Sequence, residues 1–328
     1  MQFRGGLIVA TVGIGIPVFN MDWSIGKTLI SFINQSFKDI QIIVSDDSST
    51  DKTKEAVKEI AEKSDGRISL ISNETNLGPS KNTNRCITKL INEVRPDFVI
   101  ISCADDYFVD MKALEKGVDA LKSNPQIGAV YFSWGLALPD GKIKSECRYS
   151  HLPNPFSGKD FISYILTDQN RRPIGGMGSF MVRREIYEGF PFPPFTYRES
   201  NYQFDTPTWC EVLSRAGLVY YLRDEICYLG IISGKNITGV GRYVTEFLDR
   251  WHILDDFGER FLDETKLKAA QAKLIRDLII RIAAKGVSEG EMKRLDEFIL
   301  SEGPGSLLLN RFFLRALNAQ PIKVGRRA

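Results

Sequence analysis

The stretch IISCADDYFVDM, residues 100–111, ends an apolar run with two adjacent carboxylates, Asp105 and Asp106. At about 4 Å and an effective dielectric constant of about 20, two carboxylates repel each other by roughly 4 kcal/mol. A close pair therefore requires a cation, a set of hydrogen-bond donors or full solvation. A divalent metal ion is the most specific of these partners, and a solvated turn is the simplest, since Asp is common where strands end. The pair alone leaves both interpretations open.

The elements that must position this pair can be recognised from hydrophobic periodicity. Short β-branched or aromatic runs, each bounded by Asp, Gly, Pro or Ser, are typical of strands, and stretches with helical spacing lie between them. This alternation predicts an α/β fold in which right-handed crossovers build a Rossmann-like, mostly parallel sheet flanked by helices. The apolar runs are residues 7–19, 40–45, 68–72, 97–102 and 127–135, and the helical stretches are residues 24–37, 50–63, 80–94 and 110–124.

Polar residues follow the other apolar runs as well. Asn20, Asp46 and Asp47, and Asn73 each stand where a predicted strand ends. Ligands of parallel sheets bind outside the carboxyl ends of the strands. We therefore expect these side chains and the pair at 105–106 to lie along one functional edge.

Composition excludes several classes of protein. The chain has 328 residues with 43% hydrophobic and 26% charged residues, as in an ordinary soluble globular protein. A net charge of +2 gives no support for a nucleic-acid partner. The five cysteines are odd in number and scattered, which favours neither a disulfide framework nor a zinc site and fits a reducing cytoplasm. The apolar run 7–19 is too short for a membrane span and lacks the flanks of an export signal, so we interpret it as a strand.

The pattern changes after the strand-and-helix half. Residues 138–150 predict a hairpin, and a long segment rich in Gly, Pro and aromatic residues follows, which is more often functional than accidental. Past about residue 240 the chain is mostly amphipathic helix. We predict a catalytic domain at 1–235, with a donor-binding half at 1–135 and an acceptor-side half at 136–235, and a helical C-terminal extension at 236–328.

Four motifs occur in order at the predicted strand ends: IGIPVFN, IIVSDDSSTDKT, NLGPSKNTN and CADD. Together they resemble the motifs of the family 2 glycosyltransferases of the GT-A fold, over residues 8 to about 230. Each motif is weak by itself, and their register with the strand pattern makes the set specific. The sequence departs from the family pattern where Ser48 replaces a common Gly, Lys81 a common Arg, and Cys103 the first acid of the last motif.

The resemblance implies an inverting transfer of a sugar from a nucleoside diphosphate, expected to be UDP, to a saccharide hydroxyl in polysaccharide or glycolipid assembly. Departure of the diphosphate is assisted by Mn2+ or Mg2+, which prefer oxygen ligands. By resemblance Asp106 binds the metal, and Asp105 faces the ribose or orients the site. Asp46 or Asp47 hydrogen-bonds the uracil or the ribose of the donor.

The donor side also includes Pro17 and Asn20 of the first motif, and Lys81, which is placed to reach a phosphate. A solvated surface lysine is the alternative for Lys81. Helix capping is the alternative for Ser49 and Asp51, which precede a predicted helix.

Inversion requires a general base for the acceptor hydroxyl. The family takes it from a paired-acid motif. In the matching stretch, residues 201–217, a single acid stands at the place of that pair, so Asp205 is the base candidate, and Glu211, further along the predicted helix, is the reserve. Because Thr206 and Pro207 follow, Asp205 is also a good helix N-cap.

Aromatic residues near this segment favour either a stacking platform for sugar rings or core packing. These aromatic residues are Trp134, Phe195, Tyr197, Tyr202 and Trp209.

The two histidines, His151 and His252, give little support for a metal ligand. Several relatives carry a metal-binding His in the region that matches residues 231–239, where this sequence has Ser233, Lys235 and Asn236 instead. His252 lies on a predicted helix.

The C-terminal residues 306–328 combine an apolar stripe with cationic side chains. Such a helix can lie on an anionic membrane surface, which would suit a lipid-linked acceptor at the inner membrane face. Packing on the catalytic domain or on a second subunit of a homo-oligomer is equally consistent. The cationic residues are Arg311, Arg315, Lys323, Arg326 and Arg327.

Two rival functions remain. A sugar nucleotidyltransferase shares the α/β start, but these enzymes open with a Gly-rich basic phosphate loop, which IGIPVFNMDW lacks. A catalytically inactive partner subunit that binds a nucleotide-sugar is favoured by the missing first acid and the single acid at Asp205.

Overall fold

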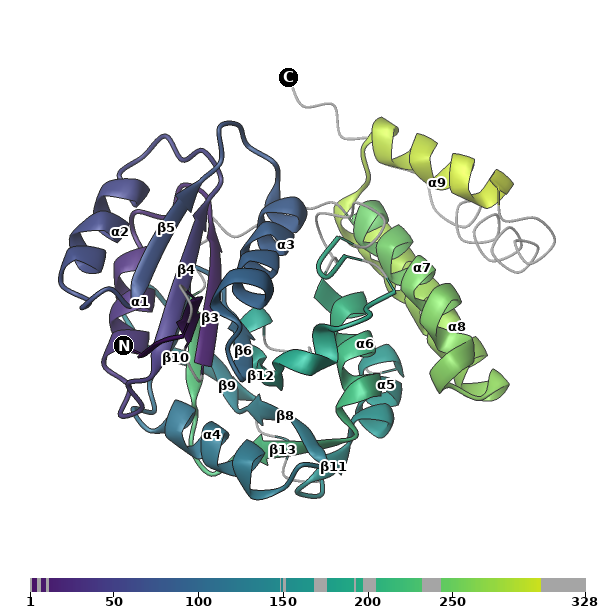
Figure 1. Ribbon diagram of the computed structural model, residues 1–328. Helices are drawn as coiled ribbons and strands as arrows, with labels where there is room; N and C mark the ends of the chain where they lie inside the picture. Colours follow the sequence, from purple (N-terminus) through teal and green to yellow (C-terminus); the bar gives the residue numbers. More distant parts are fainter. Residues whose placement is uncertain are drawn as a thin grey trace. The chain divides into compact units, whose positions relative to one another are not determined.

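The computed structural model describes residues 2–4, 7–9, 12–147, 149, 152–167, 176–191, 193–196, 205–231 and 243–301. The chain divides into two compact units. The first contains Met1–Ile165 and Asn170–Lys235, and the second contains Leu166–Gln169 and Asn236–Ala328. Figure 1 shows the elements of each unit in sequence colours.

The first unit is built on an eight-stranded sheet with the order β11-β13-β8-β12-β6-β3-β4-β5. The run β6-β3-β4-β5 is parallel, β13 is parallel to β8, and β12 lies antiparallel between β6 and β8. The α/β class and the mostly parallel sheet are as predicted. The strands are β3 (Val12–Val18), β4 (Ile40–Asp46), β5 (Ile68–Ser72), β6 (Phe98–Ile101), β8 (Ile127–Phe132), β11 (Phe156–Ser157), β12 (Phe180–Arg183) and β13 (Leu218–Leu222).

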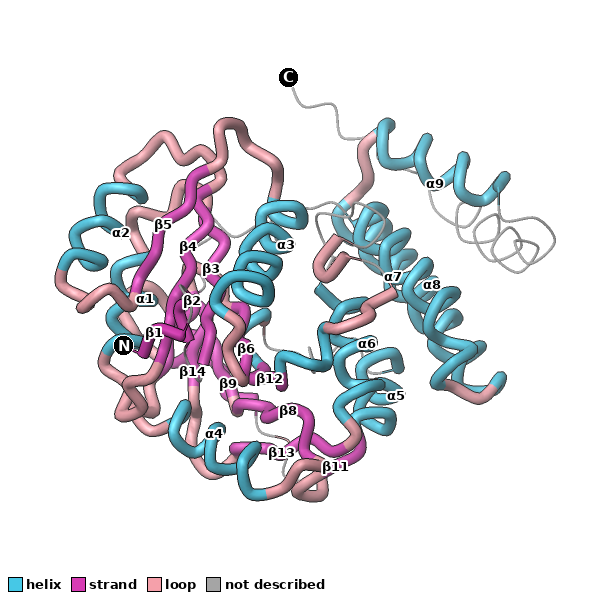
Figure 2. Tube along the Cα trace, in the orientation of Figure 1, coloured by secondary structure: helices cyan, strands magenta, loops and turns pink. Residues whose placement is uncertain are grey.

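Helices flank this sheet, with α1 and α2 on one side of β3, β4 and β5 and α3 on the other (Figure 1, Figure 2). Their apolar faces follow the predicted helical spacing, as in α1, where Ile25, Leu29 and Phe32 are buried. A π-helical turn, Leu90–Val94, continues α3. The helices are α1 (Ile25–Ile33), α2 (Thr53–Glu62), α3 (Pro79–Lys89), α4 (Ala113–Ser123), α5 (Gly158–Thr167) and α6 (Asp205–Ala216).

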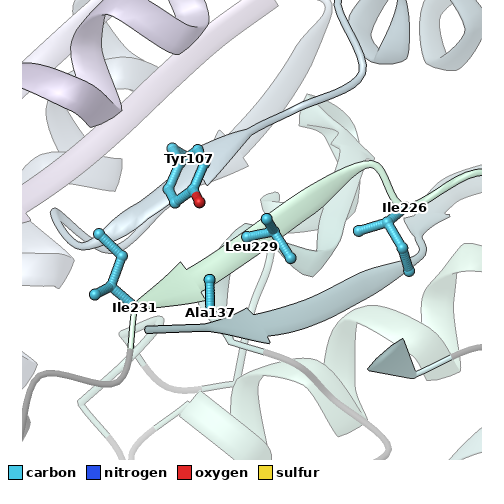
Figure 3. Packing of buried hydrophobic residues seen from close by; sticks show 5 residues of the cluster. All are labelled: Tyr107, Ala137, Ile226, Leu229 and Ile231. Atoms are coloured by element: carbon cyan, nitrogen blue, oxygen red, sulfur yellow. The ribbon is translucent and has the colours of Figure 1, made fainter. Parts of the chain in front are cut away.

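A second, four-stranded sheet has the order β10-β9-β14-β7. Strands β9 (Trp134–Ala137) and β10 (Ile143–Cys147) form the predicted hairpin. Strand β7 (Asp106–Phe108) pairs with β14 (Tyr228–Ile231), so the two are joined across a long stretch of sequence. The side chains in Figure 3 form a buried cluster on this sheet, which fixes the strand that begins at Asp106; they are Tyr107, Ala137, Ile226, Leu229 and Ile231.

The N-terminal apolar run was predicted as one strand, and the structure divides it. Strand β2 (Leu7–Val9) pairs with β1 (Gln2–Arg4) in a separate hairpin, and β3 begins at Val12.

The second unit is helical in its described part, as predicted, with α7 (Tyr243–Phe261), α8 (Glu264–Lys285) and α9 (Glu289–Ser301). The ring of His252 packs edge-on against Phe298 at 5.8 Å, which is a structural environment. Within the described ranges, none of the helices has both the length and the apolar character that crossing a bilayer requires.

Candidate active site

The carboxyl ends of β3, β4 and β5 meet at one edge of the large sheet. Parallel register places Val18 beside Asp46, and Asp46 beside Ser72. Pro17 sits beyond the residues of β3 that pair with β6, where its missing N–H costs no ladder hydrogen bond on that side. The polar residues that follow these strands are therefore neighbours, as the sequence predicts.

Asn20, predicted on the donor side, forms hydrogen bonds with the loop after β4. Its amide oxygen accepts hydrogen bonds from the Thr50 backbone N–H at 2.9 Å and the Thr50 hydroxyl at 3.4 Å. Its own N–H donates to the Ser49 hydroxyl at 2.9 Å. This side chain thus shapes the edge of the site by joining two loops.

Asp47, the first carboxylate after β4, is buried and saturated by donors from the protein. Its Oδ1 accepts from Asn73 Nδ2 at 2.7 Å and Leu77 N at 2.8 Å, and its Oδ2 accepts from Gly78 N at 2.9 Å. These bonds hold the loop between β5 and α3 against the strand end. Asp47 acts as a structural clamp in this arrangement.

Asp46 is fully buried at the last position of β4 and differs from its neighbour. Its Oδ2 accepts from Ser49 N at 3.1 Å, whereas its Oδ1 has no hydrogen-bond partner in the described part of the chain. An unsatisfied buried acceptor is costly and calls for an explanation, such as a ligand donor. Of the two residues, Asp46 has the oxygen available for a donor nucleotide.

A polar network continues from Asp47 into α3. Asn73 donates to Asn82 Oδ1 at 3.0 Å, and Asn82 in turn joins Ser45 at 2.7 Å. Gly78, with φ of 85°, turns the chain into α3 in a conformation that favours glycine. Lys81 is exposed in the first turn of α3, on the same loop-to-helix segment as this network.

Asp105 and Asp106 follow β6 and have different exposures. Asp105 is partly exposed, and its backbone carbonyl accepts from Ile231 N at 3.1 Å. Asp106 is 7% exposed, and among the described residues its Oδ2 has no hydrogen-bond partner. The buried carboxylate thus presents an oxygen without a protein donor.

Burial and mutual repulsion govern the protonation of this group. Burial, and then the charge of Asp105, raise the pKa of Asp106 well above its usual range, opposed by a hydrogen bond from the Cys103 thiol. Burial raises the pKa of Asp105. The pKa of Cys103 is also raised well above its usual range, by burial first and then by the charges of Asp106, Asp105 and Asp205. A bound cation would stabilise the charged forms of these groups and so lower their pKa values.

Asp205, the predicted base, is the first described residue of α6. Its charge helps to raise the pKa of Cys103, the thiol that hydrogen-bonds Asp106. Burial raises the pKa of Asp205, offset by hydrogen bonds from its own backbone and from Thr206. These hydrogen bonds are local to the first turn of α6, in which Asp205 is a helical residue; its role as a general base stays a prediction.

Glu211, the reserve base, is occupied elsewhere. Its carboxylate is buried and accepts from Arg215 Nε at 2.7 Å. Arg215 also donates to the carbonyls of Glu188 and Gly189, both at 2.8 Å. The bonds from Arg215 to these carbonyls join α6 to the preceding segment, and Glu211 holds Arg215 in place.

Three of the aromatic residues singled out from the sequence are buried in the core. Trp209 and Phe195 are fully buried and pack against each other at 5.6 Å, and Trp209 also packs on Phe180 at 4.8 Å. Trp134 is 1% exposed and donates to the Tyr131 hydroxyl. Core packing therefore accounts for these three. The other residues singled out from sequence, His151, Tyr197, Tyr202, Ser233, Lys235, Asn236, Arg311, Arg315, Lys323, Arg326 and Arg327, lie outside the described residues.

Sequence reasoning missed three glycines that enclose Asp106. A Cβ atom on Gly230 would lie 2.9 Å from Asp106 Oδ1, one on Gly176 would lie 3.1 Å from Oδ2, and one on Gly178 would lie 3.9 Å from Oδ2. Larger side chains would crowd the carboxylate. The sequence identifies the segment around residue 176 only by its Gly-rich composition, because its contact with Asp106 is tertiary.

The residues at this edge fit a divalent cation in part. Over the described ranges, no three His, Cys, Asp or Glu side chains form a complete metal site. Mg2+ and related ions are usually held by one or two carboxylates, with substrate phosphates and water supplying the remaining ligands. Asp105 and the orphaned Oδ2 of Asp106 fit the protein's share of such a site.

Comparison with known families decides between the general classes of α/β protein. The family model "Glycosyl transferase family 2" matches residues 14–190, more than half of the chain. The chain belongs to glycosyl transferase family 2. The match contains the ends of β3, β4, β5 and β6, so the family 2 motifs stand at the strand ends described above.

Family 2 relatives match this chain over limited lengths. An uncharacterized glycosyltransferase of Haemophilus influenzae is 32% identical over 113 residues, which is 34% of this chain and 43% of the relative. A Campylobacter jejuni protein named GalNAc(5)-diNAcBac-PP-undecaprenol beta-1,3-glucosyltransferase is 39% identical over 79 residues, which is 24% of this chain and 25% of the relative. The aligned part thus spans less than half of either relative.

A solved structure resembles this chain over most of its length. S. aureus TarS in complex with UDP aligns with a TM-score of 0.62 and 17% identity, covering 90% of this chain and 82% of that one. At this identity the likeness is one of fold. It supports the GT-A architecture predicted from the motifs.

One departure from the family 2 pattern has a physical consequence. Ser48, which stands where glycine is common, has φ of 63°, a left-handed conformation that glycine adopts without steric cost. Ser48 therefore adopts this conformation at some cost in strain.

Proposed function

We propose that this family 2 protein transfers a sugar from a UDP-sugar to a saccharide hydroxyl, with inversion at the anomeric carbon and with Mn2+ or Mg2+. The observation that carries the proposal is the buried Asp106, whose Oδ2 is left without a donor in the described chain, beside Asp105 and within electrostatic reach of Asp205 through Cys103. The UDP named in the TarS complex supports the choice of nucleotide.

Each acid has a role in the reaction. When bound, the cation neutralises the charge that develops on the departing diphosphate. Asp106 holds the cation and Asp105 orients the donor beside it. The Asp205 carboxylate takes the proton of the acceptor hydroxyl while that oxygen bonds to the anomeric carbon and the bond to the diphosphate oxygen breaks on the opposite face. Burial raises the pKa of Asp205, which makes its carboxylate a stronger base.

The remaining donor contacts follow from the strand ends. Asp46 offers its Oδ1 to the uracil or ribose, and Lys81 reaches a phosphate from the first turn of α3. Pro17 and Asn20 shape the adjoining loop. Asp47 supports the donor site indirectly, through the loop that it clamps.

Titration calorimetry with UDP tests the donor site. We expect UDP to bind much more tightly with Mn2+ than with a chelator, and Asp106→Ala to lose that difference. Asp119→Ala, an exposed acid on α4, is the matched control and should retain it. Equal binding with Mn2+ and chelator in the wild type would refute a metal-dependent UDP site, and parallel titrations with GDP and TDP would identify a different nucleotide.

Substitution of Asp205 separates catalysis from helix capping. Asn is as good an N-cap as Asp, so Asp205→Asn should leave the melting temperature unchanged. Loss of the base should lower turnover by about 100-fold to 10,000-fold while UDP affinity is kept. Normal turnover in Asp205→Asn would exclude Asp205 as the base. If the wild type shows no transferase activity with any donor tested, an inactive nucleotide-sugar-binding subunit would be favoured.

The proposed acceptor is a glycan or a lipid-linked saccharide, in polysaccharide or glycolipid assembly. Support comes from the undecaprenol-linked substrate in the name of the C. jejuni relative and from the cationic residues after position 305. We place the protein in the cytoplasm with peripheral contact at the inner membrane face. Sedimentation with vesicles that contain anionic lipid tests this contact, which must weaken with salt if it is electrostatic.

A further inference from the structure

The Asp106 carboxylate lies between two backbone walls that carry no side chains. One wall is the 3-10 turn Met177–Ser179 with the preceding Gly176, and the other is β14 at Gly230. Added Cβ atoms would stand 3.1 Å from Oδ2 at Gly176 and 2.9 Å from Oδ1 at Gly230. The distance between these walls therefore determines which orientations the carboxylate can adopt.

The hydroxyl of Ser179 organises the first wall. It donates to the Gly176 carbonyl at 2.7 Å and accepts from the Gly176 N–H at 3.1 Å. The Tyr228 hydroxyl lies 2.7 Å from the same Ser179 oxygen. A serine hydroxyl has one proton, which goes to the Gly176 carbonyl, so Tyr228 is the donor in this contact.

Tyr228 belongs to the second wall, because it lies on β14 two residues before Gly230. Its ring is 1% exposed and packs on Phe108 at 5.7 Å, and Gly230 pairs with Asp106 in the β14–β7 ladder. The hydrogen bond from Tyr228 to Ser179 therefore ties the two walls together, on the same side as the orphaned Oδ2.

We propose that Ser179 and Tyr228 are positioning residues for Asp106: their hydrogen bond sets the separation of the glycine walls and so fixes the direction in which Oδ2 meets the metal ion of the donor complex. This inference rests on the proposed function and extends it to two residues that touch neither the metal nor the sugar. A carboxylate ligand must be held closely in its productive geometry, and supporting hydrogen bonds are the usual means.

The test is the ratio of UDP dissociation constants measured with chelator and with Mn2+. Tyr228→Phe keeps the buried ring and removes the hydroxyl, and Ser179→Ala removes the other partner. We expect each to lower the ratio by about tenfold while UDP binding in chelator stays unchanged. The double variant should be no worse than Ser179→Ala alone, because Tyr228→Phe removes only an interaction that Ser179→Ala has already removed, together with the two bonds to Gly176.

The control is Tyr187→Phe, another buried tyrosine of the same unit, whose ring stacks on Phe190 at 5.6 Å. It should keep the wild-type ratio. A purely structural role for Tyr228 predicts a lower melting temperature with equal loss of UDP affinity in Mn2+ and in chelator.

Wild-type ratios in both Tyr228→Phe and Ser179→Ala would overturn the inference. If either variant fails to fold, Gly230→Ala provides a third test, since its Cβ would press on Asp106 Oδ1 and should lower the ratio as well. If the wild type shows no Mn2+-dependent UDP binding, the proposed function and this inference both fail. If the wild type shows it and the variants keep the wild-type ratio, only this inference fails.

Discussion

Two Asp-Asp pairs lie near the carboxyl ends of buried parallel strands, and the second carboxylate of each pair, Asp47 or Asp106, has opposite surroundings. After β4, Asp47 accepts three hydrogen bonds from the neighbouring loop. After β6, Asp106 Oδ2 accepts none from the residues that the structure describes. Near the carboxyl end of a strand, an Asp-Asp dipeptide thus provides a clamp at Asp47 in one case and a carboxylate oxygen without a donor in the described chain, Asp106 Oδ2, in the other.

The difference arises from what packs against each pair. The loop between β5 and α3 turns its backbone N–H groups, at Leu77 and Gly78, toward Asp47. The segments around Asp106 bring glycine Cα atoms instead, at Gly176 and Gly230. A satisfied buried carboxylate stabilises the fold, whereas an unsatisfied one costs stability and is retained where a ligand completes it.

The largest effect that separates the pairs is expected for Asp106→Asn. An amide is a poorer cation ligand, so turnover should fall by about 1,000-fold. Because burial and the Asp105 charge raise the pKa of Asp106, its ionised form destabilises the folded state at pH 7, and the neutral amide should raise the melting temperature measured in chelator. A lower melting temperature with normal turnover would make Asp106 a clamp like Asp47.

The matching change on the other pair, Asp47→Asn, should act on stability. The amide would turn an NH2 group toward one of the backbone donors and weaken the other bonds, which we expect to cost about 3 kcal/mol in the free energy of unfolding. Urea denaturation measures this value. Turnover of the remaining folded protein should stay within severalfold of wild type, and a loss of UDP affinity without loss of stability would contradict the clamp.

The fold could be predicted from the sequence to the extent that it is local. Hydrophobic spacing predicts α1 to α4 and β3 to β6, because each element buries one face that repeats within its own residues. The insertion of antiparallel β12 between β6 and β8, and the pairing of β7 with β14, depend on partners far apart in the sequence, which periodicity does not contain.

The candidate site divides in the same way. The positions of Asp46, Asp105 and Asp106 follow from the strand ends and the motifs. The role of Asp47 depends on Leu77 and Gly78, and the setting of Asp106 depends on Gly176 and Gly230, which only tertiary structure brings into contact. The sequence left open whether Trp209 and Phe195 stack on a sugar or pack in the core, and their burial shows core packing.

A smaller effect should distinguish the two members of the first pair. Asp46 Oδ2 accepts one backbone bond, from Ser49, and its Oδ1 accepts none within the described chain. Asp46→Asn can keep that bond, so we expect a stability loss of about 1 kcal/mol or less. If Oδ1 receives a donor group from the nucleotide, UDP affinity should fall by about tenfold, measured by calorimetry. Unchanged affinity would assign both members of this pair to structure.

The smallest effect is expected at Ser48, the residue next to the clamp. Its φ of 63° lies in the region that glycine adopts freely, so Ser48→Gly relieves steric strain worth about 1 kcal/mol, and the greater entropy of the unfolded glycine chain offsets part of that gain. We expect a net stabilisation of about 0.5 kcal/mol in urea denaturation, with unchanged UDP affinity. Ser48→Ala is the matched control, because it keeps the strained conformation and should not stabilise. A gain in UDP affinity in Ser48→Gly would mean instead that strain at Ser48 alters the position of Asp46, so that the turn after Asp47 and the donor-binding carboxylate are coupled.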